Sequence, residues 1–310
     1  MSSTVPRVAA TLTGLLAFPV TPFTESGDVD LSRFRSHLTD VLDAKPGAIF
    51  VACGTGELAS LTATEHQAVV SAAVEHVAGA TPVLAGVGGG TRTAAEFARA
   101  AQAAGADGVL ALPPYLQVGP QAGLVSHYRE VAAATDLDVI LYQRGTAIFS
   151  PEAVAELAEV DNIVALKDGH GDMELLQLIQ VATGGRLPLL NGMPTAEVFA
   201  RSYVGLGARA YSSAVLAFLP EVAVAFFQAF EKGDEATQDL LLREFYAPLA
   251  ELRQTTPGYA VSLVKAGLEI RGRSAGPVRA PLAQVTPQHR EQLARIIDRG
   301  LAALSATPVA

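Results

Sequence analysis

The sequence contains no tryptophan and a single cysteine, Cys53, in 310 residues. One cysteine cannot form an internal disulfide, which is typical of proteins that work in a reducing compartment. No apolar run approaches the roughly 20 residues that a membrane-spanning helix requires. The run at 14–20 is short and contains Pro19, so it does not fit a signal peptide. We therefore expect a soluble, cytoplasmic protein without a membrane partner.

The sequence also lacks any block of lysine or arginine, and its formal net charge is −9. This balance argues against a nucleic-acid partner, because nucleic-acid-binding proteins present clustered basic side chains to phosphate groups. The six histidines show no spacing typical of a metal site. We therefore expect neither nucleic acid nor a metal ion to be bound.

Half of the residues are hydrophobic, and short apolar runs recur along the chain. Each run is apolar on both faces and often β-branched, which is typical of buried parallel strands. Eight such runs lie at 15–20, 48–53, 82–87, 108–112, 139–142, 163–167, 188–191 and 208–212.

Segments with helical patterning separate the runs, at 31–44, 64–77, 92–104, 123–134, 151–159, 173–182, 195–203 and 219–230. Eight strands that alternate with eight helices predict a (β/α)8 TIM barrel. A doubly wound open sheet is the alternative, but its first strand usually leads into a glycine-rich loop. Here the first run leads into Thr21-Pro22-Phe23, so we favour the barrel.

Strand patterns stop after residue 230, and three further segments look helical, at 234–252, 259–271 and 287–304. We therefore divide the chain into a barrel at 1–232 that carries the active site and a helical region at 233–310 packed on it.

Active sites of such barrels lie at the carboxyl ends of the strands. The sixth run ends in Lys167, where burial would disfavour the charged amine and leave a nucleophile able to form a Schiff base with a ketone. The alternative is a structural lysine that reaches solvent or pairs with Asp168. Tyr142 ends the fifth run, so its hydroxyl is a candidate proton shuttle beside Lys167, or else a packing residue.

Two further strand ends carry groups suited to carboxylates. Gly54-Thr55-Gly56-Glu57 follows the second strand, and its backbone N–H groups and hydroxyl suit an anion, although glycine-rich loops also arise for steric reasons. Glu57 is a candidate base, with a structural role in the loop favoured. Arg144 has the planar fork that matches a carboxylate, or it is a surface arginine.

In this order, Gly54-Thr55-Gly56-Glu57, Pro114-Tyr115, Leu141-Tyr142 and Leu166-Lys167 resemble the dihydrodipicolinate synthase / N-acetylneuraminate lyase superfamily over nearly the whole chain. The stretches at 142–144, 167–172, 192–197 and 211–214 further resemble members that dehydrate and decarboxylate a keto sugar diacid. This resemblance implies Lys167 as the Schiff-base lysine and Tyr142 as the proton shuttle. It also implies no cofactor and a homo-oligomer, a tetramer or a dimer.

The resemblance further implies that Thr55 and Gly56 bind the carboxylate next to the ketone. We add Ser212 to that site, and Arg144 as a group that positions the remote carboxylate or the hydroxyl groups. The chain departs from the synthases at Gly54, Leu116 and Ala147, where they carry a hydroxyl residue, a tyrosine and an arginine. A retro-aldol lyase that uses the same lysine and a non-catalytic keto-acid-binding barrel are the alternative functions.

Overall fold

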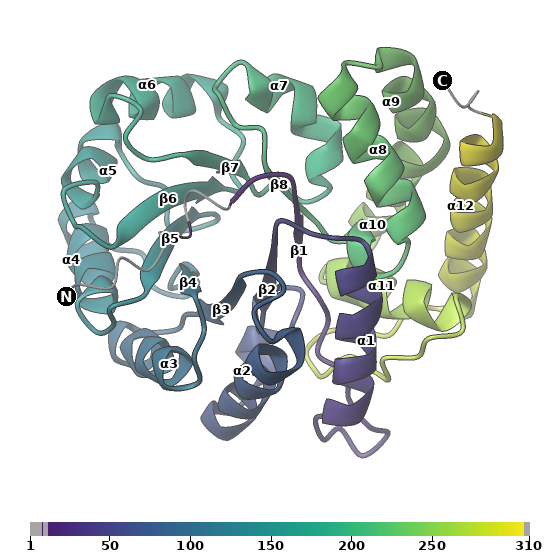
Figure 1. The fold of residues 1–310 in the computed structure, drawn as a ribbon, viewed down its shortest axis with the longest axis horizontal. Coiled ribbons are helices and arrows are strands. Elements are labelled where there is room, and N and C mark those ends of the chain that lie inside the picture. Colours follow the sequence, from purple (N-terminus) through teal and green to yellow (C-terminus); the bar gives the residue numbers. More distant parts are fainter. Residues whose placement is uncertain (1–7, 9–11, 307–310) are drawn as a thin grey trace.

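The computed structural model describes residue 8 and residues 12–306, and these form a closed barrel of eight parallel strands (Figure 1). The strands lie in chain order around the barrel, and the eighth pairs with the first. They are β1 (Leu15–Ala17), β2 (Ala48–Val51), β3 (Val83–Val87), β4 (Gly108–Ala111), β5 (Asp138–Gln143), β6 (Ile163–Asp168), β7 (Leu189–Asn191) and β8 (Tyr211–Ser213).

All eight strands fall within or overlap the apolar runs of the sequence, and the predicted barrel is confirmed. Nearly every strand residue is buried because one face fills the barrel and the other packs on helices. Several strands end earlier than their apolar runs: β1 ends at Ala17, while the buried residues 18–20 already belong to the loop above it. Apolar residues therefore also line the mouth.

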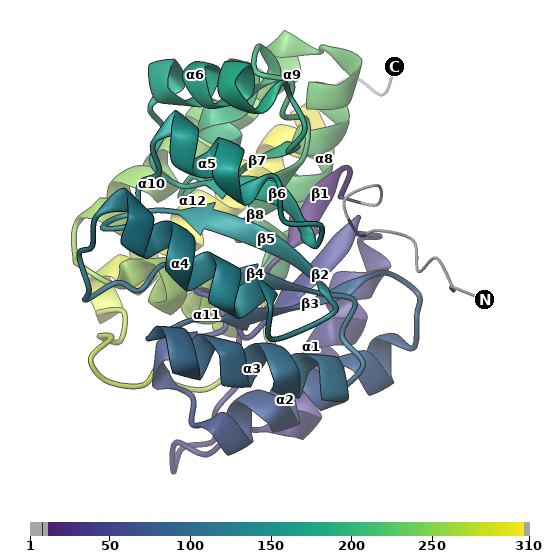
Figure 2. The ribbon, with the colours of Figure 1, turned by 90° about the vertical axis from the view of Figure 1, so that its left-hand side faces the viewer.

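Helices follow the strands as predicted and surround the barrel (Figure 2). Thr62 and Glu65 form a capping box at the start of the second helix, and Ser150 caps the fifth ahead of Pro151. The barrel helices are α1 (Leu31–Asp43), α2 (Ala63–Val77), α3 (Thr91–Ala103), α4 (Gln121–Ala132), α5 (Pro151–Leu157), α6 (Met173–Thr183), α7 (Ala200–Val204) and α8 (Pro220–Lys232). Two 3-10 turns, η3 (Ala196–Phe199) and η4 (Val215–Ala217), lie above β7 and β8.

The remaining helices are α9 (Glu235–Leu241), α10 (Ala247–Gln254), α11 (Tyr259–Ile270) and α12 (Pro287–Ala306). We expected a helical segment at 234–252, and residues 235–254 are helical throughout, with a π-helical segment, η5 (Leu242–Tyr246), between α9 and α10. Pro248 in the first turn of α10 has no N–H for the carbonyl four residues earlier, which explains a local change of hydrogen bonding here.

This helical region packs beside α8 (Figure 1). The segment η5 contacts η3, and α11 contacts η4. The predicted boundary between the barrel and the helical region, at 232/233, stays a prediction. The two predicted regions also include residues 1–7, 9–11 and 307–310, which lie outside the described residues. None of the described helices has the length and apolarity to cross a bilayer.

Candidate active site

The pairing of β5 with β6 places Tyr142 directly opposite Lys167. The Nζ atom of Lys167 lies 3.9 Å from the centroid of the Tyr142 ring and 5.1 Å from that of Phe18. Only 4% of Lys167 is exposed, and no described carboxylate forms an ion pair with it. Neither structural alternative for Lys167, a reach to solvent or an ion pair with Asp168, is observed.

Strand alternation explains why Asp168 does not pair with Lys167. Lys167 and Tyr142 point into the barrel, whereas Asp168 and Gln143 point outward, where Gln143 Nε2 donates to Asp168 Oδ1 at 2.7 Å. Asp168 also accepts hydrogen bonds from the Tyr203 hydroxyl and from the backbone N–H groups of His170 and Gly171. The carboxylate thus fixes the loop that follows Lys167 rather than its amine.

Glycines make the space around the inward pair. A Cβ atom at Gly192 would lie 2.6 Å from Lys167 Nζ, and one at Gly169 would lie 2.9 Å from the Tyr142 hydroxyl. Real Cβ atoms do not approach this closely, so these two positions require glycine. Gly169 and Gly192 belong to the motifs at 167–172 and 192–197. The structure shows that their lack of a side chain leaves the space that Lys167 and Tyr142 occupy.

The Tyr142 hydroxyl donates to the Gly192 carbonyl at 3.3 Å and accepts from Arg144 Nη1 at 3.2 Å. Burial of the phenol favours its neutral form, but the positive charges of Lys167 and Arg144 outweigh burial, so the pKa of Tyr142 is lowered. A phenol with a lowered pKa beside an amine has the properties of a group that exchanges protons with it.

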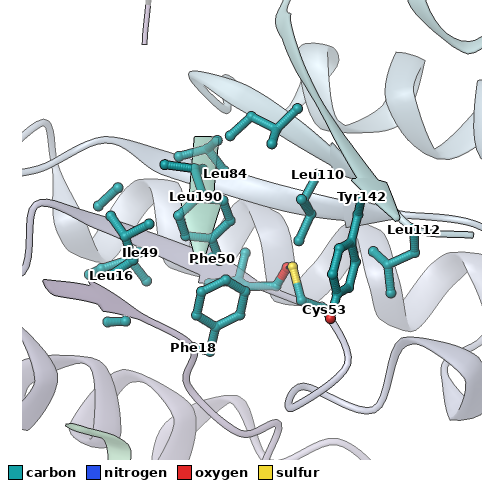
Figure 3. Close-up of a cluster of buried hydrophobic side chains, with 14 of the residues drawn as sticks. Leu16, Phe18, Ile49, Phe50, Cys53, Leu84, Leu110, Leu112, Tyr142 and Leu190 are labelled. Carbon is teal, nitrogen blue, oxygen red and sulfur yellow. The ribbon is translucent and has the colours of Figure 1, made fainter. Parts of the chain in front are cut away.

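The mouth around this pair is apolar. Phe18, Cys53 and Tyr142 gather at one edge of the buried cluster (Figure 3). Burial raises the pKa of the Cys53 thiol to about 12, although the charge of Lys167 acts in the opposite direction. Cys53 is therefore a small buried residue, as its sequence context indicates, and not a nucleophile.

The loop above β2 presents unused backbone donors. The N–H groups of Thr55 and Gly56 have no acceptor among the described residues. The Thr21 hydroxyl donates to the Gly56 carbonyl at 2.7 Å and holds the loop from the β1 side. Thr55 is partly exposed and Gly56 is buried, so the Thr55 hydroxyl and N–H are open to an anion and the Gly56 N–H is an unpaired donor next to them in the chain.

Glu57, in the same loop, is occupied by structural contacts. Its Oε1 lies 2.7 Å from the Nζ of the buried Lys265 of α11, and its Oε2 accepts the Arg279 N–H at 3.0 Å. Lys265 Nζ also donates to the Pro277 carbonyl at 2.8 Å and lies 4.1 Å from the centroid of the Phe23 ring. These contacts match the structural role favoured for Glu57.

Ser212 lies on β8, on the other side of β1 from β2. Its neighbour Tyr211 packs outward on the aromatic rings of α8, so Ser212 faces the interior of the barrel. Its hydroxyl donates to the Asn191 carbonyl at 3.4 Å. Ser212 and Thr55 share a rim with Lys167, but no hydrogen bond joins either of them to the lysine.

Arg144 lies in a tight turn after β5. Its backbone forms a bridge with Ala147, with N–H···O distances of 3.2 Å in both directions. The turn buries Ala147 completely, so an arginine at that position would not fit without a different turn. Arg144 is partly buried against Tyr142 and is not a surface arginine.

Three residues near the site were not found from the sequence. Asp168 was considered as a partner of Lys167 and as part of the motif at 167–172, but not for the contacts that it makes, and Lys265 and Arg253 were not considered at all. The Arg253 guanidinium, on α10, donates to the Thr195 hydroxyl above β7. The only sequence signal that Lys265 is buried was its position among the apolar residues of α11. Nothing in the local sequence distinguished Arg253 from arginines on the surface of other helices.

The described residues contain no group of three or more His, Cys, Asp or Glu side chains that could hold a metal ion. His170 is an exposed loop residue, as its position after the sixth strand suggested. The donors of the mouth are an amine, a phenol, a guanidinium, hydroxyls and backbone N–H groups. This set is suited to a small anionic carbonyl compound.

The fold and the mouth define a (β/α)8 barrel with a helical C-terminal region and a buried lysine at the end of the sixth strand. The chain belongs to the dihydrodipicolinate synthetase family, whose model matches residues 11–299. This membership confirms the resemblance described from the strand-end motifs.

Two similar relatives come from Streptomyces. A protein of Streptomyces coelicolor named "Probable 5-dehydro-4-deoxyglucarate dehydratase 1" is 52% identical over 301 residues, covering 94% of this chain and 95% of its own. One of Streptomyces griseus, "Probable 5-dehydro-4-deoxyglucarate dehydratase", is 50% identical over 297 residues, covering 94% and 93%.

Among solved structures, the dihydrodipicolinate synthase of Oceanobacillus iheyensis superposes with a TM-score of 0.86 at 25% identity, covering 97% of this chain and 100% of its own. That of Bacillus clausii superposes with a TM-score of 0.85 at 26% identity, covering 94% and 98%.

Proposed function

We propose that this protein is a lyase that converts 5-dehydro-4-deoxy-D-glucarate into 2,5-dioxopentanoate, water and CO2 through a Schiff base on Lys167. The contact that carries the proposal is the buried Lys167 amine, 3.9 Å from the Tyr142 ring centroid and without a carboxylate partner among the residues that the structure describes. The names of the two Streptomyces relatives support the choice of substrate.

In the first step, the neutral amine of Lys167 attacks the C5 ketone, and loss of water gives an iminium. Tyr142 passes protons to and from the departing oxygen, because its ring lies against the Lys167 amine and its hydroxyl accepts a hydrogen bond from Arg144. The C6 carboxylate, next to the ketone, binds the free N–H groups of Thr55 and Gly56, with the Ser212 hydroxyl as a further donor.

The iminium then makes a C4 proton acidic, and Tyr142 or a water removes it. Loss of the C3 hydroxyl as water gives a conjugated imine. The electrons of the C1–C2 bond flow through this conjugated system into the iminium as CO2 departs. Protonation and tautomerisation turn C2 into an aldehyde, and hydrolysis frees Lys167 and 2,5-dioxopentanoate. One electron sink serves all the steps, so the sequence of reactions requires no metal or organic cofactor.

The same proposal limits what Arg144 does. A tight pair with the departing carboxylate stabilises the ground state, since that charge is lost in the transition state. Arg144 therefore orients the C1 end of the substrate and polarises Tyr142 rather than driving decarboxylation.

Product analysis tests the proposal. The enzyme is incubated with 5-dehydro-4-deoxy-D-glucarate, and products are identified by mass spectrometry together with CO2 release. The expected products are 2,5-dioxopentanoate and CO2 in equal amounts. Release of pyruvate instead would identify a retro-aldol lyase.

Borohydride reduction tests the Schiff base. Reduction in the presence of substrate should leave an adduct on the peptide that contains Lys167, and Lys167→Ala should abolish both the adduct and turnover. A folded protein that binds the keto acid and yields no adduct would be a binding barrel instead.

We further propose that the protein is cytoplasmic and works as a homotetramer or homodimer. The side chains of Tyr115, Leu116 and Val118, in the loop between β4 and α4, are exposed by 51%, 95% and 80%, and such apolar groups favour contact with another subunit. Light scattering of the purified protein tests the assembly.

A further inference from the structure

Arg144 and Arg253 are partly buried arginines that lack a carboxylate partner within the described part of the chain. Six described arginines are partly buried, and four of them, Arg35, Arg271, Arg273 and Arg279, form ion pairs with carboxylates. Arg144 and Arg253 form none within the described part of the chain. Burying a cation without an anionic partner costs free energy. We therefore expect a bound anion to pair with these two arginines.

Both guanidinium groups lie at the mouth of the barrel, although they come from distant parts of the chain. Arg144 Nη1 donates to the Tyr142 hydroxyl at 3.2 Å. Arg253 donates through Nη1 to the hydroxyl of Thr195, in the loop above β7. Gly192, in that same loop, lies directly against the Lys167 amine.

The loop above β6 connects the two positions. A Cβ atom at Gly169 would lie 3.3 Å from Arg144 Cδ, and one at Gly171 would lie 2.9 Å from Met193 Cε. The loops of Arg144, of Lys167 and of Thr195 are therefore contiguous above β5, β6 and β7. The side chains of Arg144 and Arg253 therefore border the same stretch of the rim.

The charges of the two residues act on each other. Burial lowers the pKa of Arg253, and the positive charge of Arg144 lowers it further. Glu197 acts in the opposite direction but is directed toward β8, where its Oε1 accepts from the Ser213 hydroxyl at 2.6 Å. The remaining N–H groups of Arg253 have no acceptor among the described residues.

We propose that Arg253 and Arg144 together bind the substrate carboxylate that is remote from the ketone, which makes Arg253 a specificity-determining residue for diacids. This inference rests on the proposed function and adds a residue from the C-terminal helical region to its site. Two planar forks match the oxygens of one carboxylate. A ligand without that carboxylate leaves both cations unpaired, so the site selects diacids over monoacids of equal length.

Two keto acids of six carbons test this directly. 2-Oxoadipate has a remote carboxylate and 2-oxohexanoate has a methyl group there, and neither has a hydroxyl group to eliminate. Each is titrated against the full-length enzyme, and the adduct on Lys167 is trapped with borohydride and quantified by mass spectrometry. Half-saturating concentrations are compared between the parent enzyme and Arg253→Gln.

Arg253→Gln should raise the half-saturating concentration of 2-oxoadipate by roughly 10- to 100-fold and change that of 2-oxohexanoate by less than about 2-fold. Arg253→Lys, which keeps the charge and loses the fork, should give an intermediate shift. Arg295 is exposed and forms no ion pair with any described residue, so it provides a matched control: Arg295→Gln should change neither value.

Equal shifts for the two keto acids, or no shift for either, would overturn the inference while leaving the Schiff-base function intact. Absence of adducts in the parent enzyme would overturn the Schiff-base function and this inference with it. If Arg253→Gln does not fold, the comparison is made with Arg253→Lys, and an unchanged preference for the diacid then overturns the inference.

Discussion

Glu57 Oε1 lies 2.7 Å from Lys265 Nζ, and both side chains are buried. One residue belongs to the loop above β2 and the other to α11, so this ion pair joins the helical region to the loop that presents the Thr55 and Gly56 N–H groups. A buried ion pair adds little net stability, but removal of one partner leaves an uncompensated charge.

Lys265→Met should therefore lower the free energy of unfolding by about 3 kcal/mol, measured by urea denaturation. Lys265→Met combined with Glu57→Gln should recover part of this loss, because the uncompensated carboxylate is gone. Arg129→Met removes an exposed pair with Glu156 and should cost less than about 1 kcal/mol. A Lys265→Met loss no larger than this control would contradict the buried-pair account.

Tyr142→Phe should lower kcat by about 100-fold or more while the Lys167 adduct still forms slowly, because the phenol moves protons but makes no covalent bond. Tyr128→Phe is the matched control, since the buried Tyr128 hydroxyl donates to the Tyr142 carbonyl at 3.3 Å from outside the mouth. Its kcat should stay within a few-fold of the parent value. Full activity of Tyr142→Phe would remove the tyrosine from the mechanism.

Gly192→Ala should abolish most turnover because the new Cβ atom would lie 2.6 Å from Lys167 Nζ and 2.8 Å from the Asp168 carbonyl. Overpacking of this kind typically costs about 1–3 kcal/mol, so the fold should survive while the amine is displaced. Gly119→Ala, where a Cβ atom meets nothing within 4 Å, should behave as the parent enzyme. Formation of the Lys167 adduct at the parent rate in Gly192→Ala would contradict this expectation, because it would show that the reaction does not require the observed position of the amine.

Glu197 should make stability depend on pH. Burial raises the pKa of its carboxyl from 4.5 to about 7, so the folded state binds more protons than the unfolded state between these values. Stability is therefore greater near pH 4.5 and falls as the pH rises toward 7, by up to about 3 kcal/mol. Glu197→Gln should lose this pH-dependent part of the free energy of unfolding. Urea denaturation of the parent protein and of Glu197→Gln at pH 5 and pH 7.5 measures this difference. An equal change in the free energy of unfolding between the two pH values in both proteins would contradict the role of Glu197.

The sequence predicted the barrel and the strand-end position of Lys167 from local patterns. Apolar runs such as 163–167 report burial on both faces, and this property depends only on neighbours along the strand. The helix starts at Thr62 and Ser150 follow from capping side chains within three residues. Helical structure at 234–252 was predicted and is observed over 235–254, but the π-helical hydrogen bonding of η5 within it was not predicted.

The sequence by itself determined that Lys167, Tyr142, Thr55, Arg144 and Ser212 share one rim, because the carboxyl ends of all parallel strands in a closed barrel meet there. It could not decide what each group contacts. Only the tertiary structure placed Tyr142 over Lys167, turned Asp168 away from it, and brought Lys265 and Arg253 from the C-terminal helices to the mouth. Helix periodicity defines a polar face, but the barrel surface on which that face docks decides which of its side chains reach the site.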